Sequence, residues 1–229
     1  MRFEDLNLHP TLLKAVKYQN YTTPTAIQEQ AIPLLLRKND VLGSAQTGTG
    51  KTAAFALPIL HHLIKEKSNN HKTKVRALVV TPTRELAIQI GENFTAYSKY
   101  NNIKNTVIFG GVKQGTQTNA LNNGVDVLIA TPGRLLDLMG QGFISLNDIG
   151  YFVLDEADRM LDMGFIHDIR KILNELPKER QSLFFSATMP KNIVELSSQI
   201  LKSPKKISVS PVSSTAETIK QFIYYTNKA

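Results

Sequence analysis

Short apolar runs alternate with longer amphipathic stretches along the whole chain. Several of the short runs are apolar at nearly every position, as in Ala77-Leu-Val-Val80 and Val127-Leu-Ile-Ala130. Strands that are covered on both faces of a sheet show this pattern, so a parallel sheet flanked by helices is predicted. The predicted strands are Asp40–Ser44, Arg76–Thr81, Asn105–Phe109, Asp126–Ala130, Tyr151–Asp155, Ser182–Ser186 and Lys206–Ser210.

The longer stretches carry helix signals. Thr23 followed by Pro24 offers an N-cap and then a proline at the first helical position. Leu86, Ile90 and Phe94 recur every fourth position, which indicates a helix with one apolar face. Another helix is predicted to start at Met189-Pro190, with its apolar face formed by Ile193, Leu196, Ile200 and Leu201. Together these elements predict one α/β domain of the open, parallel type.

Turns and loops separate these elements. Asn39 stands at a turn, where asparagine tolerates left-handed backbone conformations. Ser68–Lys74 reads as a polar loop. Pro211–Ala216 reads as a loop before a last strand-like run, Phe222–Tyr225.

Composition narrows the class of protein. A length of 229 residues is enough for a sizeable core, and 42% hydrophobic with 20% charged residues is typical of soluble globular proteins. The absence of cysteine excludes a disulfide framework and cysteine-ligated metal sites. The N-terminus lacks the apolar core of a signal peptide, and no apolar run approaches the roughly 20 residues that span a bilayer. We therefore expect a cytoplasmic protein without a membrane partner.

The net charge of +8 suits a partner that carries phosphates, such as a nucleotide or a nucleic acid. The alternative is a solvated basic surface, since the lysines are scattered rather than gathered in one tract.

One loop has the pattern of a phosphate-binding site. Ser44-Ala-Gln-Thr-Gly-Thr-Gly-Lys-Thr52 lies between a predicted strand and the apolar helical stretch Ala53–Ile64. Gly48 and Gly50 let backbone N–H groups converge on an anion, and the helix N-terminus adds its dipole. Lys51 can pair with the β- and γ-phosphates of ATP, and the Thr52 hydroxyl can bind Mg²⁺. The alternative is a glycine turn with an exposed lysine.

A second motif suits the metal and the attacking water. Tyr151-Phe-Val-Leu-Asp-Glu-Ala-Asp158 is an apolar strand that ends in acidic residues. Ligands of open α/β sheets bind beyond the carboxyl ends of the strands, so these acids should share a crevice with the phosphate loop. Mg²⁺ takes few protein oxygens, and Thr52 with Asp155 would suffice. Glu156 could orient water and accept its proton. Alternatively, the acids only cap the next helix.

The segment Asp155-Glu-Ala-Asp158 resembles the motif after which the DEAD-box RNA helicase family is named, and further motifs of its N-terminal RecA-like domain follow the same order. The resemblance runs from Phe3 to about Tyr225 and extends to bacterial members, including those linked to cold shock. It implies a RecA-like P-loop fold with about seven parallel strands and helices on both faces. It also implies ATP and Mg²⁺ as cofactors and RNA as a partner. The implied catalytic residues are Lys51, Asp155 and Glu156, and the implied phosphate-loop contacts are Ala45, Gln46, Thr47, Gly48, Thr49, Gly50, Lys51 and Thr52.

The segment Tyr21–Gln28 resembles the adenine-reading motif of that family. The resemblance implies that Gln28 hydrogen-bonds the adenine edge, where an amide can match its donor and acceptor, and that Phe3 stacks on the ring. From the residues alone, Gln28 could instead be a capping-box partner of Thr25, and Phe3 an ordinary core aromatic.

Three further segments resemble the RNA-backbone contacts of the family, each just after a predicted strand. Arginines in them could pair with phosphates, while glycines and hydroxyls permit close backbone approach. Alternatively, each is only a turn. The residues concerned are Pro82, Thr83, Arg84, Gly110, Gly111, Thr131, Pro132, Gly133 and Arg134.

Ser186-Ala-Thr188 resembles the motif that bonds to the acidic segment and couples ATP hydrolysis to strand separation. Asp158, Ser186 and Thr188 would then transmit that coupling. Alternatively, the serine and threonine only start the next helix.

The family also has a second RecA-like domain, whose histidine-arginine-glycine-arginine motif is missing from this sequence. We therefore expect residues 1–210 to form the N-terminal domain and residues 211–229 to begin the interdomain connection of a longer protein. Its second domain is then a partner, and the present chain should hydrolyse ATP poorly. Two other functions stay open: a nucleotide-gated RNA-binding scaffold with a vestigial ATPase, and a DNA helicase or other P-loop motor.

Overall fold

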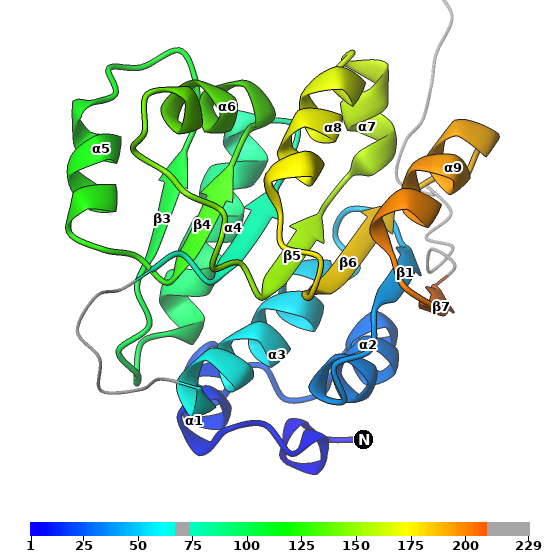
Figure 1. Cartoon of the computed structure of the whole chain (residues 1–229). Coiled ribbons are helices and arrows are strands. Elements are labelled where there is room, and N and C mark those ends of the chain that lie inside the picture. Colours follow the sequence, from blue (N-terminus) through cyan, green and yellow to red (C-terminus); the bar gives the residue numbers. More distant parts are fainter. Residues whose placement is uncertain (67–73, 210–229) are drawn as a thin grey trace, which may run out of the picture.

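The computed structural model describes residues 1–66 and 74–209 (Figure 1). Seven parallel strands form one sheet in the order β3-β4-β2-β5-β6-β1-β7. The strands are β1 (Val41–Ser44), β2 (Ala77–Val80), β3 (Asn105–Ile108), β4 (Val127–Ala130), β5 (Tyr151–Leu154), β6 (Gln181–Ser186) and β7 (Lys205–Ser208).

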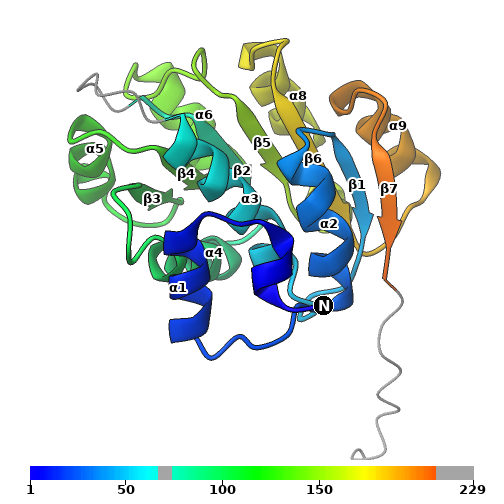
Figure 2. The same ribbon diagram turned by 90° about the horizontal axis from the view of Figure 1, so that it is seen from below.

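Helices cover both faces of the sheet (Figures 1 and 2). One face carries η1 (Phe3–Leu6), α1 (Pro10–Tyr18), α2 (Ala26–Leu36), α3 (Lys51–Lys65) and α4 (Arg84–Tyr97). The other face is covered by α5 (Gly115–Asn122), α6 (Pro132–Gly140), α7 (Ala157–Asp162), α8 (Ile166–Glu175) and α9 (Lys191–Ile200).

Two apolar cores follow from the period of the strands. Successive side chains of a strand point to opposite faces, so Val79 joins the core under α3 and α4 while Val80 joins the core under α6 and α8. All four residues of β2, β4 and β5 are buried, because helices lie on both sides of these strands. This explains why these strands appear in the sequence as continuous apolar runs.

The fold class and all seven predicted strands are confirmed, with ends shifted by one or two residues. The start predicted for the second helix is wrong. Thr25 rather than Thr23 is the N-cap of α2, because its backbone N–H donates to Gln28 Oε1 at 2.9 Å in a capping box.

The turn before β1 also differs from expectation. Lys38, with φ of 60°, holds the left-handed conformation expected of Asn39. Asn39 stabilises the end of α2 instead, because its side-chain amide donates to the Leu34 carbonyl at 3.1 Å. The predicted loops and strand at Ser68–Lys74, Pro211–Ala216 and Phe222–Tyr225 lie mainly or wholly outside the described residues, as does the proposed connection at 211–229.

Strand order decides which loops meet. Loops that follow β1, β5 and β6 lie beside one another at the carboxyl edge of the sheet, and the loops that follow β2, β3 and β4 form the other half of that edge. None of the helices in residues 1–66 and 74–209 combines the length and apolar character that crossing a bilayer requires.

His61 in α3 should make stability depend on pH. Its side chain is 7% exposed, and its Nδ1 atom has no hydrogen-bond partner among the described residues. Burial lowers the pKa of His61 to about 4, with the neighbouring charges of Lys65 and His62 adding to the effect. The unfolded chain therefore binds more protons below its histidine pKa of about 6.5. The free energy of unfolding is therefore unaffected by His61 above that pH and decreases as the pH falls from about 6.5 toward about 4.

Between about pH 7.5 and about pH 5, the wild type should lose about 2 kcal/mol more unfolding free energy than His61→Leu. Urea unfolding at each pH measures it. His167→Leu removes an exposed histidine from α8 and serves as the control. Equal pH dependence in the wild type and His61→Leu would contradict the assignment.

Candidate functional site

The phosphate loop spans residues 45–50, between the end of β1 and the first residue of α3. Gly48 and Gly50 have φ of 86° and 93°, a region that side chains disfavour. A Cβ atom on Gly50 would lie 2.6 Å from Gln28 Nε2 and 2.8 Å from Thr25 Oγ1, so packing against the start of α2 adds to the preference for glycine that the φ sets. A Cβ on Gly48 would meet nothing within 4 Å, so space is open beside the loop.

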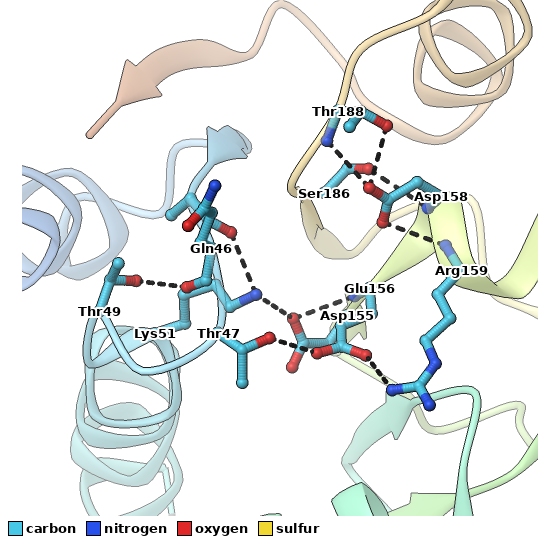
Figure 3. Close-up of polar contacts among 11 residues, drawn as sticks. Gln46, Thr47, Thr49, Lys51, Asp155, Glu156, Asp158, Arg159, Ser186 and Thr188 are labelled. Carbon is cyan, nitrogen blue, oxygen red and sulfur yellow. Dashed lines mark hydrogen bonds and ion pairs between the residues drawn. The ribbon is translucent and has the colours of Figure 1, made fainter. Parts of the chain in front are cut away.

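Lys51 and Asp155 form the centre of the site. The Lys51 ammonium lies 3.6 Å from Asp155 Oδ1 and donates to the Ala45 carbonyl at 3.2 Å (Figure 3). Their side chains are only 6% and 2% exposed. Burial raises the pKa of Asp155, an effect that the charge of Lys51 opposes and the charge of Glu156 reinforces. A cation bound beside Asp155 would act in the same direction as Lys51 and favour the charged carboxylate.

Glu156 has a strained backbone, and each of its carboxylate oxygens accepts a hydrogen bond. Its backbone is left-handed, with φ of 55° and ψ of 51°, a conformation that costs a non-glycine residue about 1 kcal/mol or more and clusters at functional sites. Thr47 donates its hydroxyl to Oε1 at 2.8 Å, and Arg159 lies 3.3 Å from Oε2 (Figure 3). The phosphate loop and the candidate general base are therefore in direct contact.

Asp158 connects this segment to the end of β6. The Thr188 backbone N–H and hydroxyl donate to Asp158 Oδ2 at 2.9 and 3.0 Å, and the Asp158 N–H donates to Ser186 Oγ at 3.2 Å (Figure 3). Burial alone would raise the pKa of Asp158, but the hydrogen bonds from Thr188 outweigh it and lower the pKa. The Ala45 N–H donates to the Ser186 carbonyl at 3.2 Å, so β6 contacts both motifs.

A pocket of about 210 Å³ opens between these segments and α4. Among the predicted nucleotide contacts, its lining includes Gln28, Thr47, Gly48, Gly50, Lys51, Thr52, Asp155 and Glu156. Ala45 is buried behind it, and Thr49 closes the loop by donating its hydroxyl to the Gln46 carbonyl at 2.8 Å.

Gln28 is the capping-box partner of Thr25, and its contact with adenine stays a prediction. Its Oε1 atom accepts from Thr25 in the capping box, and its Nε2 atom donates to the Gly50 carbonyl at 3.1 Å. Phe3 is 2% exposed and is not among the residues that line the pocket. Tyr21 does line it, and the rings of Phe3 and Tyr21 lie 6.2 Å apart. The aromatic residues that line the pocket are therefore Tyr21 and Tyr97 rather than Phe3.

Sequence reasoning missed the wall that α4 contributes to the pocket. The Tyr97 hydroxyl donates to Asn93 Oδ1 at 3.3 Å, and its oxygen lies 3.3 Å from the Tyr21 hydroxyl oxygen. The amphipathic pattern of α4 predicted which face is apolar, but no local signal indicates that residues of this helix reach the nucleotide loop. The residues of α4 that line the pocket are Leu86, Gln89, Asn93 and Tyr97.

A separate surface hollow of about 470 Å³ gathers most of the predicted RNA contacts. The exposed Arg84 guanidinium lies 4.8 Å from the centre of the Phe109 ring. Thr83 caps α4 by accepting from the Leu86 N–H at 3.3 Å, and Gly111 has φ of 79°. The predicted contacts that line the hollow are Pro82, Arg84, Gly110, Thr131, Gly133 and Arg134.

Arg134 is engaged within the protein. It donates to the Val112 carbonyl at 3.0 Å and to Gln117 Oε1 at 3.2 Å, and it lies 3.4 Å from Asp137 Oδ2. Thr131 is the N-cap of α6 and the buried Pro132 is its first residue. Arg134 therefore orders the loop around Gly111, whereas Arg84 is the arginine of this hollow without an ion pair among the described residues.

The site fits a metal that needs few protein ligands. No group of three or more histidines or acids that could hold a metal occurs in the described part of the chain. Thr52 and Asp155 supply oxygen atoms to the same pocket, and oxygen is the ligand that Mg²⁺ prefers. Bound phosphates and water would have to complete the coordination of such an ion.

Comparisons with known proteins agree with this geometry. The chain is 42% identical over 226 residues to an ATP-dependent RNA helicase, RhlB, of Actinobacillus succinogenes, covering 98% of the chain and 55% of the relative. It is 46% identical over 226 residues to the DEAD-box ATP-dependent RNA helicase RhpA of Helicobacter pylori, covering 99% of the chain and 45% of the relative. The chain thus spans about half the length of these relatives.

A solved structure has the same fold. The crystal structure of a DEAD box protein from the hyperthermophile Methanococcus jannaschii superimposes with a TM-score of 0.85 at 40% identity, covering 92% of this chain and 56% of that one. A sequence model of the family described as DEAD/DEAH box helicase matches residues 25–196. The chain therefore belongs to the DEAD/DEAH box helicase family.

Proposed function

We propose that this chain is the nucleotide-binding half of an ATP-dependent RNA helicase, which binds Mg-ATP and the RNA backbone and couples hydrolysis to the remodelling of RNA duplexes. The observation that carries the proposal is the buried pair of Lys51 and Asp155, 3.6 Å apart beside an open phosphate loop. The names of the relatives, which are ATP-dependent RNA helicases, support the substrate class.

We propose a separate role for each group of residues in the pocket. Backbone N–H groups at Gly48 and Gly50, with the N-terminus of α3, hold the phosphates. Lys51 would turn its ammonium from Asp155 toward the β- and γ-phosphates, and Thr52 and Asp155 would hold the metal directly or through water. Mg²⁺ held by Thr52 and Asp155 would neutralise the charge that develops on the phosphates.

Glu156 is the proposed general base. Its Oε1 atom accepts from Thr47 and its Oε2 atom lies beside Arg159, and each oxygen keeps a further lone pair that can accept from water. Phosphates in the loop would compete for the Thr47 hydroxyl, and loss of that donor would make Glu156 a stronger base. A filled loop would thereby favour hydrolysis.

Asp158 is proposed to transmit the state of the pocket to β6. It binds Thr188 through two hydrogen bonds and Ser186 through one. A shift of the segment 155–158 would therefore move the start of the loop that follows β6. We propose this link as the coupling between ATP hydrolysis and RNA remodelling.

The relatives extend well beyond the matched region, which supports a second RecA-like domain as partner of this one. We propose that this domain supplies arginines to the γ-phosphate. Arginines of this kind contribute about 10³–10⁵ in rate in related phosphoryl-transfer systems.

Mg-ATP hydrolysis by this chain, with and without single-stranded RNA, tests the proposal. We expect measurable ATP binding and very slow hydrolysis, because the arginines are missing. Glu156→Gln should keep the binding and remove the residual hydrolysis.

Failure to bind ATP would contradict the assignment of the pocket, whereas fast RNA-stimulated hydrolysis that Glu156→Gln abolishes would contradict the need for a second domain. If Glu156→Gln in the full-length protein leaves hydrolysis unchanged, the RNA-binding scaffold is the better description.

Tyr21→Leu should weaken ATP binding by about fivefold or more, because stacking of a base on an aromatic ring contributes about 1–3 kcal/mol. Phe3→Leu should change ATP affinity less and lower the unfolding free energy by about 1 kcal/mol or more, as expected for a buried ring. Titration with a fluorescent ATP analogue and urea unfolding measure the two effects. The reverse order of affinities would support direct stacking by Phe3.

Arg84→Gln should lower the affinity for single-stranded RNA and reduce the slope of log K against log salt by about 0.7, the loss of one phosphate contact. Its unfolding free energy should hardly change, because Arg84 is exposed. Arg134→Gln should lower both affinity and stability, since it breaks contacts to Val112, Gln117 and Asp137. Fluorescence anisotropy over a range of salt concentrations distinguishes the two arginines. Competition with a DNA strand of the same sequence tests the preference for RNA.

A further inference from the structure

Two long stretches of the chain contain no acidic residue. Residues 6–28 and 93–125 lack Asp and Glu, although the whole chain has 19 acids. The first stretch contributes α1 and the second begins in the last turns of α4. These two helices contact each other in the fold, so α1 and the acid-free end of α4 lie together on one side of the sheet (Figure 2).

Lysines and tyrosines interleave where the ends of the two helices meet. The Lys99 ammonium lies 3.2 Å from the centre of the Tyr18 ring and 5.8 Å from that of Tyr100. The Lys14 ammonium lies 4.2 Å from the centre of the Tyr100 ring. The two rings meet edge to face at 6.4 Å. We call this cluster of Lys14, Lys17, Tyr18, Lys99 and Tyr100 the basic aromatic surface.

The charges of this surface are not neutralised. Tyr18 is 58% exposed, although a large aromatic ring is usually better covered. The ammonium groups of Lys14, Lys17 and Lys99 form no ion pair with any residue in the described ranges. The surface therefore presents exposed ring area and unpaired positive charge together.

The surface continues into a hollow of about 490 Å³ between α4 and the start of β3. Lys99 and Lys104 line it, and the Lys104 ammonium also has no ion pair among the described residues. Ser98 lines it too, and its hydroxyl is buried without a hydrogen-bond partner, in a side chain that is 7% exposed. A buried hydroxyl without a partner is unfavourable, so a bound polar group would stabilise it.

The place of the surface sets it apart from the site described above. Tyr18 and Tyr100 lie three residues from Tyr21 and Tyr97, the hydroxyl-linked pair that lines the nucleotide pocket. The lysines of the surface line neither that pocket nor the hollow that holds Arg84. The basic aromatic surface thus lies outside both sets of predicted contacts.

We propose that the basic aromatic surface binds single-stranded RNA, with bases stacking on Tyr18 and Tyr100 and phosphates pairing with the surrounding lysines. Exposed ring area combined with lysines that form no ion pair is what single-stranded nucleic acid requires. An acidic peptide would use the charges but would have less use for the exposed rings. This goes beyond the proposed function, because it needs neither the nucleotide pocket nor Arg84. The competing explanation is that the lysines only stabilise the contact between α1 and α4.

Two sets of variants separate these explanations. The charge pair Lys14→Gln with Lys99→Gln removes two phosphate partners, and Lys171→Gln with Lys191→Gln removes the same charge from α8 and α9 on the other face of the sheet. The ring pair Tyr18→Leu with Tyr100→Leu removes stacking, and Tyr18→Phe with Tyr100→Phe keeps it. Each is titrated by fluorescence anisotropy with a labelled, unstructured RNA strand about 20 nucleotides long, which is ample for one such surface.

The charge pair on the surface should bind RNA at least fivefold more weakly than wild type, with the salt slope reduced by about 1.4 for two phosphates. The Leu pair should lose fivefold or more and the Phe pair should stay near wild type, because stacking needs a ring but no hydroxyl. The charge pair on α8 and α9 should change affinity less than twofold. Affinity for the ATP analogue should stay unchanged in every variant, which also shows that each is folded.

RNA affinity equal to wild type in the charge and ring variants would overturn the proposal, and so would an equal loss in the control pair. A labelled polyglutamate peptide that binds the surface more tightly than the RNA would assign it to an acidic protein instead. Combination with Arg84→Gln keeps the two RNA sites distinguishable, because losses at independent sites add. If Arg84→Gln alone has no effect, the RNA contact proposed for the hollow that contains Arg84 fails, while the basic aromatic surface stands.

Discussion

The buried pair of Lys51 and Asp155 is the interaction on which the candidate site depends. Both side chains are more than nine-tenths buried, and their 3.6 Å separation joins the loop after β1 to the end of β5 across the intervening β6. Removal of either partner from such a pair leaves an uncompensated charge in a poorly hydrated place. The same burial prepares the site for a ligand, because a phosphate for Lys51 and a cation for Asp155 would replace the contact with stronger ones.

The order of the strands divides the carboxyl edge of the sheet into two functional halves. Strands β5, β6 and β1 present the nucleotide motifs, whereas β3, β4 and β2 present the predicted RNA contacts. The boundary between the halves falls between β2 and β5, which pair directly. Arg84 and Asp155 therefore follow adjacent strands. A displacement of the loop after one of these strands could be transmitted directly to the loop after the other. This arrangement would place the two proposed ligands side by side at one edge of the sheet.

Several residues with proposed ligand contacts are already bound to other parts of the protein. Thr47 and Arg159 engage Glu156, while Gln28 bonds to both Thr25 and the Gly50 carbonyl. These contacts satisfy polar groups that would otherwise be buried without partners. They also mean that a nucleotide must exchange protein contacts for its own. The affinity of the site then reflects the difference between two sets of hydrogen bonds rather than the sum of one set.

The sequence by itself determined the class of fold, the seven strands, the phosphate loop and the acidic segment, because these depend on local periodicity and on residues close together in the chain. It misjudged the start of α2 by two residues and the left-handed residue before β1, since neighbouring caps and turns compete there on small energy differences. Only the tertiary structure decided that Tyr21 and α4 line the pocket, that Phe3 lies behind Tyr21 in the core, and that Arg134 is engaged while Arg84 is exposed. The physical reason is that strand order and helix packing bring together residues far apart in the sequence, and no local pattern records which of them will meet.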